Sequence, residues 1–355
     1  GVDHRISDPP PFQVKKPTRR DNRNVANDDR PFLSHGRDGE AMLQILKSEN
    51  EILRELSPNT FEKGAWINLM DPSSEELNAV KKLVDLPLDV LTAALDEEES
   101  ARLEIENEYI LVLIDVPRKR DNDRYETLPL GIIMLPDTVV TVCLEETDVL
   151  TSFNRMTAKL FNTGKRTRFL FNILYRSATF FLRYLRQINI RTDEIERHLR
   201  QSMKNEELFQ LLEMEKSLTY FTASLRTNHM VIDKLLRLRN NPKVEHLIKI
   251  YEEDEDLLED ALVEYRQAIE MVQMYGQILS GMMDAFASII SNNLNMVMKF
   301  LTSMTIILAI PTMFASFWGM NVGVPLLGKP LGFWAVGAIS ALAARTSARH
   351  ASPRI

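Results

Sequence analysis

The sequence has little of what disulfide-bonded proteins and metalloenzymes depend on. Cysteine occurs once in 355 residues, at Cys143, which excludes an intrachain disulfide and a cysteine zinc cluster. Because Cys143 lies in the strand-like run VVTVCLEE, we expect a buried, inert thiol. The six histidines form no His-x-x-x-His pair, so no imidazole metal site is encoded locally.

Catalytic motifs are also lacking. The chain has no glycine-rich phosphate loop, no Gly-x-Ser-x-Gly and no nucleophile with a local base, so we predict that it is not an enzyme and uses no organic cofactor. Its 43 basic and 50 acidic residues give a formal charge of −7. Since nucleic-acid binding needs a basic face, nucleic acid is not an expected partner, whereas an acidic protein suits cations.

A single long uncharged run, FLTSMTIILAIPTMFASFWGMN, occupies residues 300–321. Its apolar part, about 19 residues, is just long enough to cross a hydrocarbon core of about 30 Å. Lys299 precedes it, and no charge follows until Lys329, after which Leu331 to Ala344 form a second apolar run. We therefore predict a two-pass membrane protein whose second run is short, about 14 residues or 21 Å.

The two ends of the chain differ from the rest. Residues 1–40 are rich in Arg, Asp, Pro and Asn and lack the apolar segment of a secretory signal. We predict a disordered leader there, either native or left from an expression vector. The closing ARTSARHASPRI contains the tail 347–355 and is expected to be a truncated end or a cloning scar.

Residues 41–165 are predicted to form a cytosolic α/β domain. Ser73-Ser74-Glu75-Glu76 has the pattern of a capping box and opens a helix expected to run to about Val84. A second helix is expected at 88–95. Strand-like runs, bounded by turn residues, lie at 65–72, 106–117, 125–135 and 138–146.

Residues 166–299 are predicted to form a cytosolic helical stalk. Strand signals stop at about Lys165, and helical stretches follow at about 167–201, 206–239 and 243–317. Asn240-Asn241-Pro242 is the only strong breaker among them. The last stretch, about 75 residues, would extend about 110 Å. Its apolar residues recur at helical spacing, so it needs helical partners.

Three features together resemble the CorA family of divalent-cation channels: Gly319-Met320-Asn321 at the end of the apolar helix, a long stalk before it and a second apolar run after it. The likeness goes beyond the tripeptide. SNNLNMVMKFLTSMTIILAIPTMFASFWGMN resembles the family's first membrane helix, and WINLMDPSSEEL with LPLDVL resembles its cytosolic domain. The resemblance covers about Glu40 to Ala344.

The resemblance implies an α+β membrane protein, a funnel-shaped homopentamer in the cell membrane that is multi-pass with both termini cytoplasmic. The first transmembrane helix, at 300–318, would line the pore. An external loop, at 319–330, would lead to a second transmembrane helix, at 331–346, in the outer ring. The implied partners are other copies of the chain, the lipid bilayer and divalent cations.

Small and hydroxylated residues form one stripe on the first membrane helix, because they are spaced by three, four, three and four. In an isolated membrane helix this spacing favours close packing of helices. With the resemblance, it implies a pore lined by hydroxyls and backbone dipoles above an apolar constriction. The stripe comprises Thr302, Thr305, Ala309, Thr312 and Ser316, and the implied pore lining also includes Asn295 and the constriction residues Met298 and Leu301.

The tripeptide is the expected selectivity filter. Mg²⁺ holds its water tightly, so a ring of Asn321 amides would accept hydrogen bonds from the hydrated ion without stripping it. Gly319 would let the backbone turn at the helix end, and Met320 would pack against a neighbouring subunit. The alternative is a plain helix stop made of Gly and Asn.

Carboxylates crowd residues 252–260. Such a run is either a solvated helix face or a surface that attracts hard cations. By resemblance, Asp260 falls at an intersubunit regulatory Mg²⁺ site, but Thr92-Ala93 stands where an acidic pair is common, so metal-controlled gating is an open question. The tentative regulatory ligands are Asp260, Asp284, Asp89 and Asp96.

The predicted function is transport of a divalent cation, foremost Mg²⁺ and also Co²⁺ or Ni²⁺. One alternative is the related zinc-transporting branch, which can carry a glycine soon after the Asn, as Gly323 does here. Another is a membrane-anchored coiled-coil scaffold, which needs neither the Asn nor the hydroxyl stripe. The loop VGVPLLGK contains Lys329 and no acid, which weakens cation attraction at the mouth. The physiological cation, the direction of transport and any proton coupling are not decided by the sequence.

Overall fold

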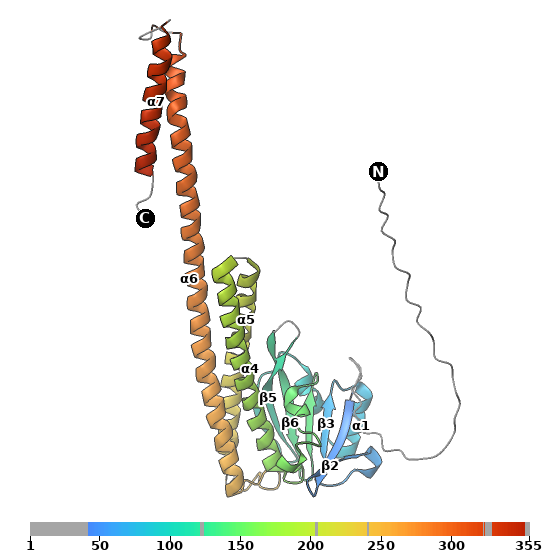
Figure 1. The fold of residues 1–355 in the computed structure, drawn as a ribbon. Helices are drawn as coiled ribbons and strands as arrows, with labels where there is room; N and C mark the ends of the chain where they lie inside the picture. Colours follow the sequence, from blue (N-terminus) through green and yellow to red (C-terminus); the bar gives the residue numbers. More distant parts are fainter. Residues whose placement is uncertain are drawn as a thin grey trace, which may run out of the picture. The chain divides into compact units, whose positions relative to one another are not determined.

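The computed structural model describes residues 42–120, 124–202, 205–239, 241–321, 323 and 329–351 (Figure 1). The predicted leader 1–40 lies outside the described residues, as do most of the loop after Asn321 and residues 352–355.

A seven-stranded mixed sheet forms the first part of the described chain. The strand order is β2-β1-β3-β7-β6-β5-β4. Only β3 and β7 pair in parallel, with Trp66 opposite Val139, and the other neighbours are antiparallel. The strands are β1 (Met42–Glu49), β2 (Ile52–Leu56), β3 (Trp66–Met70), β4 (Arg102–Ile105), β5 (Ile110–Lys119), β6 (Tyr125–Met134) and β7 (Val139–Cys143).

The four predicted strand runs are confirmed as β3, β5, β6 and β7, whereas β1, β2 and β4 were not predicted. β3 and β7 are buried at every position, as expected for central strands covered on both faces. β1 and β2 form an edge hairpin that turns at Asn50 and Glu51, whose φ angles are 47° and 66°. The turn contains no glycine, so the usual hairpin signal is missing.

The predicted buried thiol is confirmed. Cys143 is fully buried at the end of β7, and its Sγ lies 3.4 Å from the carbonyl oxygen of Pro129. Burial raises the pKa of the Cys143 thiol to about 12. The thiol therefore stays protonated and unreactive at neutral pH.

Two layers of helices cover the sheet. One face packs against α1 (Ser74–Val84), α2 (Leu88–Thr92) and the short 3₁₀ helix Ala93–Leu95. The predicted capping box is confirmed, since Ser73 N–H donates to Glu76 at 2.9 Å and Glu76 N–H donates to Ser73 Oγ at 3.3 Å. The other face packs against α4 (Arg166–Ser202) and α5 (Asn205–Leu236), and α6 (Glu252–Trp318) packs in turn against these two helices. Two short helices, α3 (Asp148–Thr151) and the 3₁₀ turn Ala158–Leu160, lead into α4.

Asn228 fixes α5 to the open edge of the sheet. The pairing of β4 with β5 ends at Leu113, which leaves the backbone of Asp115 without a strand partner on that side. The buried amide of Asn228 donates to the Asp115 carbonyl at 2.7 Å and accepts from its N–H at 2.8 Å. The polar groups of this edge are thereby satisfied inside the fold.

The predicted helix 243–317 is wrong at its beginning, because α6 starts at Glu252. The apolar residues before it, including Val244 and Leu247, are buried in turns. Arg166 donates to the Leu247 carbonyl at 3.0 Å, and Lys249 N–H donates to Thr167 Oγ1 at 3.2 Å. This segment is held against the first turn of α4 and so does not extend α6.

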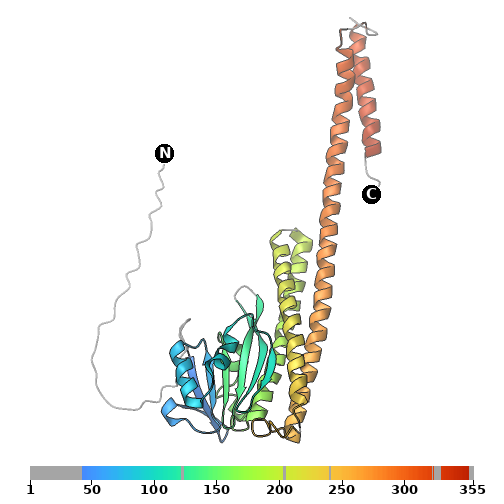
Figure 2. The ribbon, with the colours of Figure 1, turned by 180° about the vertical axis from the view of Figure 1, so that it is seen from behind.

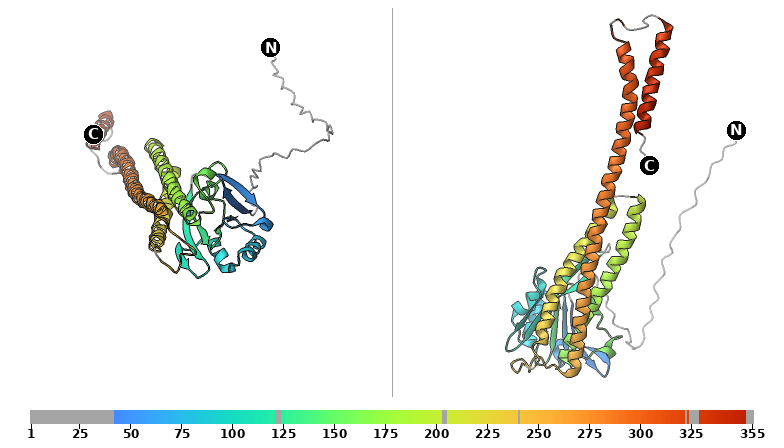
Figure 3. Two further views of the ribbon diagram at one scale, coloured as in Figure 1. Left: turned by 90° about the horizontal axis from the view of Figure 1, so that it is seen from below. Right: turned by 90° about the vertical axis from the view of Figure 1, so that its left-hand side faces the viewer.

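The helix α6 continues well past the ends of α4 and α5, and α7 (Pro330–Ala351) packs back along its upper end (Figures 1 and 2). Figure 3 shows the same arrangement from two further sides. With 67 residues, α6 is about 100 Å long. Among the described residues, α6 alone has the length and composition of a membrane span, with an 18-residue window of mean hydropathy 1.8 that is not buried. α7 is longer than the predicted 331–346 at both ends.

Candidate functional site

The predicted pore-lining residues all lie on the upper part of α6 and are all exposed in the single subunit. The helix turns by about 100° per residue, so the hydroxyl stripe lies within a narrow sector of its surface. The exposed set is Asn295, Met298, Leu301, Thr302, Thr305, Ala309, Thr312 and Ser316.

The opposite face of the same segment packs against α7. Ser303, Ile307, Ile310, Phe314 and Trp318 are half-buried there. At 100° per residue the centre of this face lies about 180° from the centre of the hydroxyl stripe. α7 therefore covers the apolar side of α6 and leaves the polar side uncovered.

Two hydroxyls of the stripe are satisfied within α6. Thr305 Oγ1 donates to the Leu301 carbonyl at 2.8 Å, and Thr312 Oγ1 donates to the Leu308 carbonyl at 3.0 Å. Such bonds to the preceding turn let a hydroxyl reside in an apolar surrounding. The oxygen lone pairs still point outward as acceptors.

The tripeptide closes α6. Gly319 N–H donates to the Ala315 carbonyl at 3.0 Å, and its φ of −81° and ψ of −1° are open to any residue. These angles do not require glycine, and the sharp turn expected at Gly319 stays a prediction. The side chain of Met320 is 53% exposed and Asn321 is also exposed, so nothing within the described chain covers them.

The tentative regulatory ligands do not form a cluster within one subunit. Asp260 and Asp284 are exposed on α6, whereas Asp89 and Asp96 are exposed beside α2, on the other side of the sheet. Within the described residues no three His, Cys, Asp or Glu side chains come close enough to hold a metal ion. A site that joins Asp260 to Asp89 or Asp96 would require two copies of the chain.

Part of the acidic run has a structural role. Asp254, 6% exposed, accepts from Arg168 at 3.1 Å, and Arg168 also donates to the Glu253 carbonyl. Glu255 pairs with Arg239. The carboxylates of the first turn also interact favourably with the positive end of the helix dipole. These contacts fix the beginning of α6 to α4 and to the turn that follows α5.

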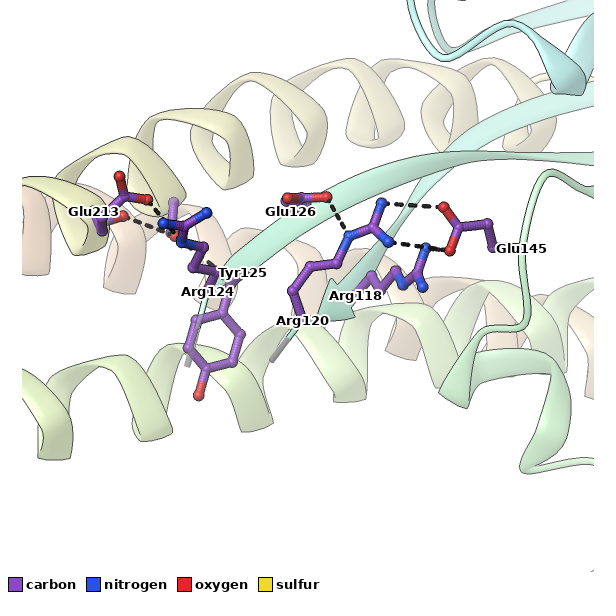
Figure 4. Close-up of polar contacts among 8 residues, drawn as sticks. Arg118, Arg120, Arg124, Tyr125, Glu126, Glu145 and Glu213 are labelled. Atoms are coloured by element: carbon purple, nitrogen blue, oxygen red, sulfur yellow. Dashed lines mark hydrogen bonds and ion pairs between the residues drawn. The ribbon is translucent and has the colours of Figure 1, made fainter. Parts of the chain in front are cut away.

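A second charged cluster lies where β5 and β6 meet (Figure 4). Arg120 donates to Glu126 at 2.9 Å and to both oxygens of Glu145 at 3.1 and 3.2 Å, and Arg118 also pairs with Glu145. Arg124 pairs with Glu213 of α5 at 3.4 Å. Each carboxylate here faces an arginine, so the cluster holds the hairpin in place and is a poor cation site.

Comparisons with known proteins agree with this geometry. The sequence profile of the family described as CorA-like Mg²⁺ transporter protein matches residues 61–346. The cobalt/magnesium transport protein CorA of Methanocaldococcus jannaschii is 29% identical over 309 residues, which cover 84% of this chain and 93% of that protein.

Solved structures show the same fold. The complete structure of the CorA magnesium transporter from Methanocaldococcus jannaschii is similar with a TM-score of 0.75 and 26% identity, covering 88% of this chain and 99% of that one. The cytoplasmic domain of ZntB from Vibrio parahaemolyticus gives a TM-score of 0.54 at 11% identity, covering 72% and 99%. At that identity the second likeness concerns the fold alone.

Proposed function

Because the chain belongs to the CorA-like Mg²⁺ transporter family, a family of divalent-cation transporters and not of enzymes, we propose that its cargo is foremost Mg²⁺, and also Co²⁺ and Ni²⁺. The observation that carries the proposal is the exposed polar stripe on α6, which ends at the exposed Asn321. The path for the ion runs along this stripe.

The pore is assembled from five copies of the chain. α6 is about 100 Å long, and its upper part is covered by α7 on one side alone. It therefore needs further helices as neighbours. Since α7 lies opposite the hydroxyl stripe, copies arranged around an axis place the stripe inside and α7 outside. Met298 and Leu301, both more than half exposed, then form the apolar constriction below the hydroxyls.

Both helices cross the membrane and their inner ends lie on the cytoplasmic side. α7 is antiparallel to α6, so Lys299 before the first apolar run and Arg345 and Arg349 after the second mark the same side. Basic residues that flank membrane helices favour the cytoplasm. The part of the chain that precedes Lys299, including the lower part of α6, is then cytoplasmic as well. We call it the soluble part.

Asn321 selects the ion at the outer entrance. A ring of neutral amides accepts hydrogen bonds from the first water shell of Mg²⁺, which sheds its water reluctantly. The membrane potential supplies the driving force, about 4.6 kcal/mol for two charges across 100 mV. An open pore therefore needs a mechanism that closes it. Intracellular Mg²⁺ bound between subunits at Asp260 closes it, but this Mg²⁺ site is weak here because Thr92 and Ala93 offer no carboxylate.

Zinc transport is the second candidate, and Gly323 two residues after Asn321 is the observation that favours it. The scaffold alternative has no support from the family match. Flux into liposomes decides among the three: purified protein is reconstituted and uptake of Mg²⁺, Co²⁺, Ni²⁺ and Zn²⁺ is measured with and without a proton gradient. We expect Mg²⁺ uptake driven by voltage alone. Uptake of Zn²⁺ only, coupled to protons, would support the zinc branch, and no uptake would support the scaffold.

The oligomeric state is tested separately. The mass of the detergent-solubilised protein, corrected for bound detergent, should be five times that of the chain. A monomer in several mild detergents would contradict the pentameric pore.

A further inference from the structure

The last part of the chain carries positive charge without any carboxylate to balance it. Residues 285–355 contain Lys299, Lys329, Arg345, Arg349 and one more arginine, but no Asp or Glu. The same residues of other copies add no acid either, so residues 285–355 supply no Asp or Glu to pair with the arginines of α7.

Arg345 and Arg349 lie on the side of α7 that faces away from α6. The face toward α6 consists of buried or half-buried small residues, among them Gly332, Val336 and Ala343. Arg345 and Arg349, four residues apart, are exposed about 180° around the helix from this face. In a pentamer with the hydroxyl stripe at the axis, they face lipid and not the pore.

The two arginines also lie at the depth of a membrane leaflet. α7 begins beside the upper end of α6, and its apolar part, Leu331 to Ala344, is about 21 Å long. The apolar part of α6 is about 28 Å long. Arg345 therefore falls a few ångströms inside the slab that α6 defines, within reach of the phosphates of the cytoplasmic leaflet.

The same side of α7 offers space for an acyl chain. Trp334 is 74% exposed near the outer end of the helix, and Ala338 and Ala341, both exposed, lie between it and Arg345. These four side chains follow one another at spacings of four, three and four and so share one face. This face therefore carries small side chains between the aromatic ring and the guanidinium.

We propose that the outward face of α7 is a binding site for an anionic phospholipid of the cytoplasmic leaflet, whose phosphate contacts Arg345 and Arg349 and whose acyl chain lies along Ala338 and Ala341. The proposal rests on the membrane insertion and pentameric arrangement given above. It also takes Arg345 and Arg349 as native residues of α7, which runs to Ala351, in place of the truncated end or cloning scar that the sequence suggested. Arginine suits it because its planar guanidinium binds phosphate with two parallel hydrogen bonds.

The test uses the full-length protein in mild detergent with equal amounts of phosphatidylglycerol and phosphatidylcholine, and native mass spectrometry counts the lipids retained. A basic side chain near an anionic surface raises affinity about fivefold. The ratio of phosphatidylglycerol to phosphatidylcholine retained should fall about 25-fold in the R345Q/R349Q double variant. R345K/R349K should keep most of it, and K329Q, at the other end of α7, should keep all of it.

Further arms separate the sources of phosphate and the two proposals. Adding inorganic phosphate at millimolar concentration should leave the preference unchanged, and competition by it would reduce the site to a general anion site. Equal retention of the two lipids by the wild type, or an unchanged preference in R345Q/R349Q, would overturn the lipid site. Mg²⁺ flux of the same samples in phosphatidylcholine liposomes reports on the proposed transport independently: flux without lipid preference refutes only the lipid site, and lipid preference without flux refutes only the transport.

Discussion

The lower and upper parts of α6 belong to one continuous helix but are stabilised in different ways. In the lower part, up to Phe286, nine side chains are buried, and this part packs against α4 and α5. In the upper part, 287–318, no side chain is buried in the single subunit and only one face has a neighbour, α7. The lower part is therefore complete within one chain, whereas the upper part is not.

The difference also appears in the polar contacts. In the lower part Tyr265, fully buried, bonds to Ser177 of α4 at 3.0 Å, so its hydroxyl has a partner on another helix. In the upper part the hydroxyls of Thr305 and Thr312 bond to carbonyls of α6 itself. Tyr265 thus joins two helices in the lower part, whereas these two threonine bonds join α6 to no other element.

The largest expected effect is at the upper end of α6. Replacing Asn321 by Ala should reduce Mg²⁺ flux in liposomes to the background of empty vesicles, because no nearby carboxylate replaces the amide at the entrance. Expression and oligomer mass should not change. Asn78→Ala, on the surface of α1, is the matched control and should transport normally. Undiminished flux in Asn321→Ala would rule out the proposed filter.

The second prediction contrasts two leucines of α6. Leu258 is fully buried and Leu294 is 61% exposed. Leu258→Ala should lower the unfolding free energy of the soluble part by about 3 kcal/mol, measured by urea denaturation followed by circular dichroism. Leu294→Ala should leave this value within about 0.5 kcal/mol of wild type. Equal losses would show that the lower and upper parts do not differ as described.

The third prediction is a loss of one hydrogen bond in the lower part. Tyr265→Phe removes the hydroxyl that bonds to Ser177 and leaves that buried Ser177 without this partner, which should cost about 1 to 2 kcal/mol of stability. Tyr275→Phe, on a half-buried tyrosine of the same helix, is the control and should cost less than about 0.5 kcal/mol. The same denaturation assay applies, and an unchanged midpoint in Tyr265→Phe would contradict the contact.

The smallest expected effect concerns Asp260. Asp260 is exposed, and no cluster of metal ligands forms around it among the residues that the structure describes. Because a site with few charged ligands is weak, Asp260→Ala should shift the Mg²⁺ concentration that protects the stalk from protease only about twofold to threefold. A shift of tenfold or more would mean that Asp89 or Asp96 of another copy completes a strong site.

Much of the fold follows from patterns that the sequence shows directly. The capping box of α1, the buried runs of β3 and β7 and the absence of breakers in α6 each depend on neighbouring residues, and each prediction is confirmed. The predicted beginning of α6 is wrong because Val244 and Leu247 occur at helical spacing but are buried by tertiary contacts with α4. β1 and β2 were missed because Asn50 and Glu51 make a tight turn without glycine.

The candidate site also has a part that could be predicted from the sequence and a part that could not. The hydroxyl stripe is a property of one helix, so its residues could be listed from the sequence. That α7 lies on the opposite side of α6 could not be derived, because it depends on how the small residues of α7 pack. The outward position of Arg345 and Arg349 follows from that packing too, since the sequence shows only that the apolar run ends there.

The threonine bonds within α6 have a consequence for the sign of the ion that the proposed pore would accept. Thr305 and Thr312 give their hydroxyl protons to α6 carbonyls, so these two side chains present only oxygen lone pairs to the uncovered side. The water around a cation turns its hydrogens outward and meets these lone pairs favourably. The water around an anion turns its oxygens outward and meets like partial charge. In the proposed pore, these neutral threonines would therefore disfavour anions through the direction of their dipoles, without a formal charge.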